Sequence, residues 1–227
     1  MSNPKSIQFE GQAGVIDCAL DWPQQEPRGW ALVLHPLPIE GGSRDNKVVT
    51  TISRACADLG LLAVRPNFRG VGQSAGSFDA ARGETHDMHA LVTQFYTHFP
   101  QFEGHPWALA GFSFGTAVAA QLYALLAQAR QPTPQALLLA GTAVERFRHL
   151  QVSVPEFTYL VHGADDEIVP LSEAMAFARQ QDLAVTVIPD CTHFFHGKLI
   201  LLRQLISDQI HLMAHRPITP GSHISST

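Results

Sequence analysis

Short, continuously apolar segments alternate with amphipathic segments along most of the chain, and this alternation limits the possible folds more than any other feature. The apolar segments predict strands at "GWALVLHP", "LLAVRPNF", "PWALAGF", "QALLLAG", "FTYLVHG" and "AVTVIP". Helical spacing of apolar residues predicts helices near 48–59 and 88–99, just after residue 113, and at Leu171–Gln181 and Phe194–Met213. Strands that are apolar throughout indicate a parallel sheet covered by helices on both faces.

A pair of strands, "SIQFEG" and "GVIDCALDW", is predicted ahead of this alternation, with a turn between them. The sequence therefore predicts an α/β fold with a mostly parallel, doubly wound sheet of about eight strands flanked by helices. The 227 residues suit one domain, expected over 1–214, and "HRPITPGSHISST" predicts a loosely ordered tail over 215–227.

Composition excludes several classes of protein. The net charge of −5 and the absence of a Lys/Arg cluster argue against nucleic-acid binding. No segment has the length and apolarity of a membrane span or an export signal. The odd number of cysteines and their spacing favour reduced thiols in the cytoplasm, with neither a metal nor another cofactor. We expect a small-molecule substrate, no membrane partner, and either a monomer or a homodimer.

The stretch "ALAGFSFGTAVAAQLYALL" places Ser113 between a strand and a helix, with Gly111 and Gly115 two positions away on either side. A turn this tight leaves no room for side chains at those two positions. The pattern is typical of a nucleophile elbow, in which the serine hydroxyl projects above the sheet edge. The alternative is an ordinary turn with a helix-capping serine.

A serine hydroxyl needs a base to accept its proton, and on this fold the order along the chain is serine, acid, histidine. After the strand "FTYLVHG" the chain offers three acids: Asp165, Asp166 and Glu167. After the last strand it offers two histidines: His193 and His196. We favour Asp166 and His193, and expect Asp165 and Glu167 to be solvated and His196 to be packed or exposed near the first turn of the closing helix. His35 and His162, at strand ends, are interpreted as local hydrogen-bonding residues that could border the site.

Two backbone N–H groups are candidates for an oxyanion hole. One belongs to Phe114, the residue after the serine. The other must come from the loop "HPLPIEGG", where Pro36 and Pro38 have no N–H and Leu37 is the nearest donor. The alternative is that this loop is a rigid turn that only ends a strand.

Five segments in sequence order resemble those of the α/β-hydrolase superfamily: "HPLPIEGGSRDNKVV", "RPNFRGVGQSAGSFD", "LAGFSFG", "HGADDEIVP" and "CTHFFHGKL". More narrowly, the chain resembles small predicted bacterial hydrolases related to dienelactone hydrolases and to serine-peptidase-like hydrolases. The resemblance runs from Gly29 to Leu202.

The resemblance implies a serine hydrolase with Ser113 as nucleophile, His193 as base and Asp166 as the acid that orients it. In the family's acid motif the aspartate lies three residues after a glycine and four before a proline. Gly163 and Pro170 therefore select Asp166 over Asp165. Relatives often have histidine where this chain has Leu37. Because the expected oxyanion donor is a backbone N–H, we expect this side-chain difference to affect substrate contacts more than the oxyanion hole. We assign no catalytic role to "RPNFRGVGQSAGSFD", although Arg69 is a candidate to line the pocket.

The segment "TAVERFRHLQVSVPE", where many relatives insert a cap, is too short to form one. We therefore expect no cap domain and an open site, with apolar contacts from Leu37, Phe114 and Phe194 or Phe195. An open site suits small esters or thioesters cleaved through an acyl-enzyme. Two alternatives stay open: a serine peptidase acting on short peptides, and a non-catalytic binding module on the same fold.

Overall fold

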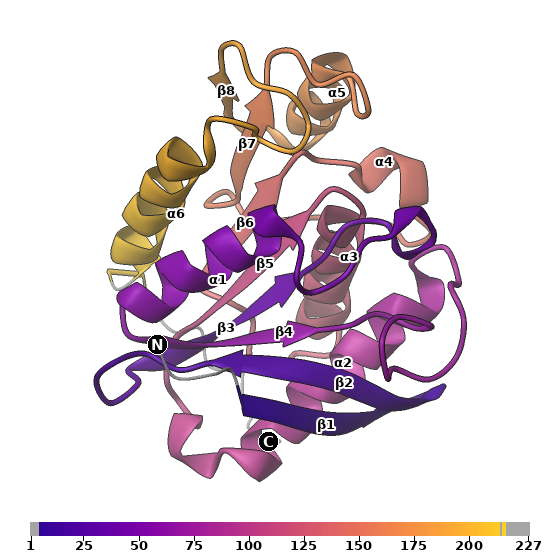
Figure 1. The fold of residues 1–227 in the computed structure, drawn as a ribbon, viewed down its shortest axis with the longest axis vertical. Coiled ribbons are helices and arrows are strands. Elements are labelled where there is room, and N and C mark those ends of the chain that lie inside the picture. The colour runs from indigo at the N-terminus through magenta and orange to yellow at the C-terminus, as the bar shows by residue number, and fades with distance from the viewer. Residues whose placement is uncertain (1–4, 214, 217–227) are drawn as a thin grey trace, which may run out of the picture.

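The computed structural model describes residues 5–213 and 215–216, and its centre is one sheet of eight strands (Figure 1). The strands lie in the order β1-β2-β4-β3-β5-β6-β7-β8. Their bounds are β1 Lys5–Gly11, β2 Gly14–Asp21, β3 Gly29–Leu34, β4 Leu61–Pro66, β5 Trp107–Phe112, β6 Ala136–Ala140, β7 Tyr159–Gly163 and β8 Val185–Ile188. β1–β2 and β2–β4 pair antiparallel and every other neighbouring pair is parallel. The predicted fold class is confirmed.

Helices cover both faces of the sheet, as the apolar strands require (Figure 1). Helices α1 (Lys47–Asp58) and α6 (Leu199–Met213) pack together on one face. Helices α2 (Arg82–His98), α3 (Phe114–Gln128) and α5 (Leu171–Gln181) contribute to the core on the other. Successive residues of β3 enter the two cores alternately, because neighbouring side chains of a strand point to opposite faces.

Two helix starts differ from the positions expected from the sequence, in which Asp45 is the candidate N-cap of the first helix. The helix cap of α1 is Asn46, whose side chain accepts the Val48 N–H at 2.9 Å. Helix α6 begins at Leu199, five residues later than expected from Phe194. Phe195 and Gly197 have φ values of 54° and 71°, and this left-handed backbone is incompatible with a continuous helix.

Only one short helix, α4 (Val144–Phe147), lies between β6 and β7, so no cap covers the sheet edge there. Two single turns of 3-10 helix, η1 (Pro38–Glu40) and η2 (Pro100–Phe102), complete the elements. No helix in the described ranges is both long and apolar enough to cross a bilayer.

Most of the expected tail, residues 217–227, lies outside the described residues. Of its first two residues, Arg216 donates a hydrogen bond to the Gln135 carbonyl at 2.9 Å. The Arg216 guanidinium also lies 4.8 Å from the centre of the Phe157 ring. The chain is therefore tied to the domain up to this point.

Candidate active site

Ser113 occupies a strained turn between β5 and α3, with φ 53° and ψ −121°. A Cβ added at Gly111 would lie 2.3 Å from the Gly115 carbonyl oxygen, and one added at Gly115 would lie 2.5 Å from the Leu34 carbonyl oxygen. Both positions therefore exclude every other residue without a backbone shift. The Ser113 side chain makes no capping hydrogen bond to α3, which argues against the capping-serine alternative.

Three side chains from three separate loops form a hydrogen-bonded chain at this turn. The Ser113 Oγ lies 2.9 Å from His193 Nε2, and His193 Nδ1 lies 2.7 Å from Asp166 Oδ2. All three residues are buried, with exposed fractions of 7% for Ser113, 3% for His193 and 6% for Asp166. Because an ionised carboxylate only accepts, the Asp166 contact places a proton on Nδ1 and leaves Nε2 free to accept the serine proton.

Aromatic packing and a glycine position the His193 imidazole. The centroid of its ring lies 5.0 Å from that of Phe112 and 5.2 Å from that of Phe194. On the β6 side, a Cβ added at Gly141 would lie 3.3 Å from the imidazole. A ring held this way has little rotational freedom, so the serine and aspartate bonds need little further ordering.

The Asp166 carboxylate is held by four donors. Its Oδ1 accepts the N–H groups of Ile168 and Val169 at 3.0 and 2.8 Å. Its Oδ2 lies within bonding distance of two imidazoles, His193 at 2.7 Å and His162 at 3.2 Å. Burial alone would raise the pKa of the Asp166 carboxyl, but these hydrogen bonds, from His162 first and then His193 and Val169, hold it well below its usual range.

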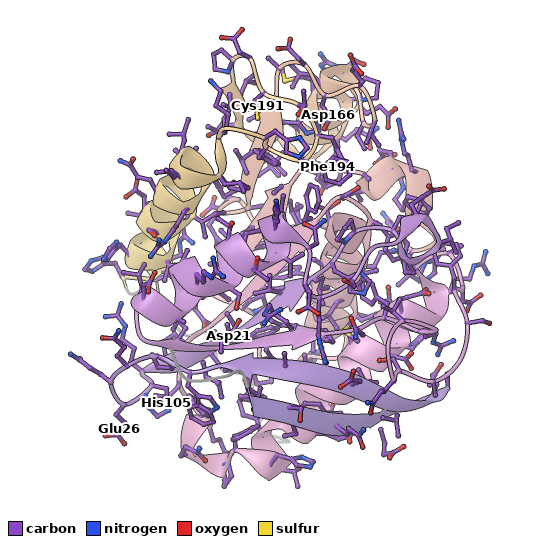
Figure 2. All side chains as sticks on the ribbon, viewed as in Figure 1. Asp21, Glu26, His105, Asp166, Cys191 and Phe194 are labelled. Atoms are coloured by element: carbon purple, nitrogen blue, oxygen red, sulfur yellow. The ribbon has the colours of Figure 1, made fainter. Side chains whose placement is uncertain are left out.

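The serine and the imidazole open into a cleft of about 490 Å³ at the carboxyl ends of the strands. Figure 2 shows Asp166 and Phe194 in this region, next to β7 and the loop after β8. Residues that line the cleft include Leu37, Ser113, Phe147, Ile168, His193 and Phe194. A larger hollow of about 650 Å³, beside the C-terminal half of α3, contains none of the predicted site residues.

Comparisons with known proteins place the fold in a superfamily. No protein-family model matches the chain. A crystal structure of XC6422 from Xanthomonas campestris, described as an α/β serine hydrolase without lid, is 35% identical, with a TM-score of 0.83 over 97% of this chain and 98% of that chain. This chain belongs to the α/β-hydrolase superfamily.

Two further relatives extend the comparison. An α/β serine hydrolase homologue from Coxiella burnetii is 33% identical to this hydrolase, with a TM-score of 0.79 over 92% of this chain and 99% of that one. The uncharacterized protein RP471 of Rickettsia prowazekii is 29% identical over 215 residues, which are 90% of this chain and 87% of the relative. These likenesses span nearly the whole hydrolase domain rather than one motif.

The loop after β3 presents the first predicted oxyanion donor of this hydrolase. Leu37 has φ −54°, and its carbonyl accepts the N–H groups of Glu40 at 3.2 Å and Gly42 at 3.0 Å. Within residues 5–213 and 215–216, no protein acceptor binds the Leu37 N–H. The second predicted donor, Phe114, is the first residue of α3, so its N–H has no partner within the helix.

His35 holds the start of this loop through hydrogen bonds of both its ring nitrogens. Its Nδ1 donates to the Pro36 carbonyl at 2.7 Å, and its Nε2 accepts the Phe68 N–H at 2.9 Å. Both contacts require the neutral imidazole. Burial, the largest cause, lowers the pKa of His35 to about 4, so the neutral form persists under ordinary conditions.

The other candidate polar residues lie away from the hydrogen-bonded chain. Asp165 and Glu167 are exposed, as expected for solvated acids. His196 is exposed in the loop before α6, not in the first turn of that helix. Arg69 does not line the cleft, and its guanidinium is bound to Asp87.

One expected apolar contact, Phe114, is wrong, and of the two alternatives Phe194 and Phe195 it is Phe194 that lines the cleft. The Phe114 and Phe195 side chains are fully buried and do not line the cleft. Phe114 is turned into the core, with its ring 4.9 Å from that of Phe147 in an edge-on arrangement. Leu37 and Phe194 line the cleft as expected. Among the described residues, no group of three or more His, Cys, Asp or Glu side chains is arranged to hold a metal ion.

Proposed function

We propose that this protein is a serine hydrolase that cleaves small carboxylic esters or thioesters through an acyl-enzyme formed on Ser113. The observation that supports this proposal best is the hydrogen-bonded chain, 2.9 Å from Ser113 Oγ to His193 Nε2 and 2.7 Å from His193 Nδ1 to Asp166 Oδ2. It connects a hydroxyl on a strained turn to a base whose second nitrogen is already bound.

In the first step, the Ser113 Oγ attacks the substrate carbonyl carbon while His193 Nε2 accepts the hydroxyl proton. The carbonyl electron pair moves to oxygen, and the oxyanion accepts hydrogen bonds from the Leu37 and Phe114 N–H groups. Asp166 keeps the imidazole in the Nδ1–H tautomer and stabilises the imidazolium. The bond to the alcohol or thiol then breaks, and the leaving group takes the proton from Nε2.

In the second step, water attacks the acyl-enzyme carbonyl and gives a proton to His193 Nε2. The new oxyanion occupies the same pair of N–H donors. When the bond to Ser113 Oγ breaks, the proton returns to that oxygen and the carboxylic acid leaves. The same three side chains therefore act twice, with no net change in the enzyme.

The shape of the cleft supports small or exposed acyl groups. The chain between β6 and β7 adds only α4, so no cap encloses a long acyl chain. Apolar side chains stand at the mouth, with Ile168 48% exposed and Phe194 38% exposed. An ester with a short apolar acyl part can contact these side chains while its leaving group stays in solvent.

Hydrolysis of a short nitrophenyl ester by wild type and Ser113→Ala tests the proposal. The variant lacks the nucleophile, so we expect its kcat/KM to fall by roughly four orders of magnitude or more, with an unchanged circular dichroism spectrum. Ser53→Ala is the matched control, because Ser53 is a buried serine outside the cleft. A Ser113→Ala enzyme as active as the wild type would overturn the proposal.

Short peptides are the second substrate class to test. A peptidase of this kind needs a carboxylate for the substrate ammonium group, and Glu40 lines the cleft with an exposed side chain. No ion-pair partner for Glu40 occurs among the described residues. Matched esters and amides of one amino acid separate the two classes. Turnover of the ester that is much faster than turnover of the amide supports the esterase. Amide turnover that is comparable to ester turnover, and that falls in Glu40→Gln, supports the peptidase.

A further inference from the structure

A second imidazole, that of His162, lies next to Asp166 and has no role in the mechanism proposed above. His162 is the fourth residue of β7 and is completely buried. Its Nε2 lies 2.8 Å from the Val169 carbonyl oxygen and 3.2 Å from Asp166 Oδ2. Asp166 Oδ2 is the same oxygen that binds His193.

The contacts determine where the His162 proton resides. A carbonyl oxygen and an ionised carboxylate only accept hydrogen bonds, so the single Nε2–H is shared: it donates to the Val169 carbonyl at 2.8 Å and, over a longer distance of 3.2 Å, to Asp166 Oδ2. The other ring nitrogen, Nδ1, is buried with no hydrogen-bond partner among the described residues. A second proton on Nδ1 would leave a buried N–H of a cation unsatisfied, which is costly. The contacts therefore place the proton of the neutral imidazole on Nε2.

These bonds close a small ring around the acid loop. The Val169 N–H donates to Asp166 Oδ1, and the Val169 carbonyl accepts from His162, which also donates to Asp166 Oδ2. Both carboxylate oxygens are thus fixed relative to β7. Without His162, Oδ1 keeps its two backbone donors, but among the described residues His193 is the one donor left at Oδ2.

We propose that His162 is a positioning residue that donates its Nε2 proton to Asp166 Oδ2 and so aims the carboxylate at His193 Nδ1. This inference rests on the proposed function and adds a fourth side chain to it. His162 is buried and does not line the cleft, so it acts only through Asp166. An imidazole in this position supplies a directed donor without adding a permanent positive charge, which a lysine or arginine would bring.

Three substitutions test the proposal. His162→Leu removes the donor and fills much of the volume. His162→Gln places an amide N–H near the position of Nε2, and His162→Asn keeps an amide that ends one atom short. We expect kcat, per Ser113 labelled by a fluorophosphonate, to fall about 10-fold or more in the Leu and Asn variants with little change in KM, since losing an outer partner that orients a functional side chain typically costs 10–100-fold. The Gln variant should recover most of the rate.

A readout independent of turnover is the proton NMR resonance of His193 Nδ1–H, which reports on the bond to Asp166. We expect the resonance to shift in His162→Leu and His162→Asn and to return toward the wild-type position in His162→Gln. Thermal unfolding of each variant separates this effect from a loss of folded protein. If His162→Leu does not fold, the Asn and Gln pair makes the same comparison.

The proposal is overturned if the Leu and Asn variants keep kcat per labelled site within twofold of the wild type and leave the resonance in place. It is also overturned if all three variants lose activity only in proportion to their unfolded fraction. If the wild type neither turns over esters nor is labelled, the proposed function fails. The resonance then still decides whether His162 orients Asp166, because it requires no substrate.

Discussion

Asp21 and Asp166 are both carboxylates fixed by hydrogen bonds at the end of a strand, but their partners differ. Asp21, the last residue of β2, accepts from the Arg65 guanidinium at 2.7 and 3.2 Å and from the Ser53 hydroxyl. Asp166, after β7, is bound by two imidazoles and two backbone N–H groups. Figure 2 shows the two aspartates in different parts of the molecule, Asp21 near β2 and Asp166 near β7.

The difference shows how the partner decides what a hydrogen-bonded carboxylate can do. A guanidinium remains protonated and has no acceptor, so the Asp21–Arg65 pair joins β2 to β4 and cannot relay a proton. An imidazole bound through one nitrogen keeps the other for a second contact, and His193 uses it to reach Ser113. The same residue type therefore stabilises the fold at Asp21 and belongs to the proposed catalytic site at Asp166.

Asp166→Asn should have the largest effect. The Asn side chain can still accept from the Ile168 and Val169 N–H groups, but its NH2 group cannot accept the His193 Nδ1 proton and favours the wrong tautomer. We expect kcat/KM for a short nitrophenyl ester to fall by roughly four orders of magnitude. Asp165→Asn, at the exposed neighbour, should stay within twofold, and an Asp166→Asn enzyme with more than a tenth of wild-type activity would refute the assignment.

Leu37→Pro tests the proposed oxyanion donor without changing any side chain of the hydrogen-bonded chain. The φ of −54° at Leu37 suits proline, so the substitution removes the N–H with little change in backbone shape. We expect kcat to fall roughly 10²–10³-fold, measured with the same ester. Leu37→Ala keeps the N–H and should retain most of kcat; equal losses in the two variants would show that the side chain, not the donor, matters.

Asp21→Asn should lower stability and leave activity unchanged, whereas the main effect of Asp166→Asn is on activity. It leaves the buried Arg65 guanidinium without its main counter-charge, so we expect the free energy of unfolding to drop by about 3 kcal/mol. Urea denaturation followed by tryptophan fluorescence measures this loss. The kcat/KM of the folded enzyme should not change, and a selective loss of activity would mean that the two aspartates do not have separate tasks.

His35→Gln should have the smallest effect, seen as a change in the pH dependence of stability. Because the folded pKa of His35 is about 4, below the ordinary value near 6.5, the unfolded chain binds the proton more tightly. Stability should therefore fall as pH drops from 6.5 toward 4, by about 2 kcal/mol from this residue. Glutamine can donate and accept without titrating, so the variant should show a smaller slope in urea denaturation over this range; equal slopes would contradict the assignment.

Asp166 affects a lower pH range. Its folded pKa lies below the ordinary value, so its carboxylate stabilises the fold above about pH 4 and loses that contribution only at more acidic pH. The His35 and Asp166 effects can thus be measured in the same series of denaturation curves.

The six strands from β3 to β8 were predictable because each is short, mostly apolar and bounded by Gly or Pro. Helix α5 was predicted with its observed bounds, Leu171–Gln181. The predicted start of α6 was wrong because the apolar pattern continues through Phe194 and Phe195, while the left-handed backbone at Phe195 delays the helix to Leu199. Periodicity in sequence does not reveal such a turn.

The nucleophile turn was predictable because its two glycines have a steric cause that the sequence displays. The facing of side chains was not predictable: Phe114 turns into the core while Phe194 lines the cleft. The sequence placed His162 at a strand end as a local hydrogen-bonding residue, but its contact with Asp166 depends on how the acid loop folds back over β7. The sequence does place a histidine four residues before Asp166, but this spacing alone does not show that the two side chains make contact.

The central claim is that Ser113 is the activated nucleophile of the cleft. Labelling with a fluorophosphonate, followed by intact mass measurement and peptide mapping, tests it most directly. We expect one adduct per chain, on Ser113, which forms slowly in Asp166→Asn and not at all in Ser113→Ala. An unlabelled wild type, or an adduct on another residue that persists in Ser113→Ala, would contradict it.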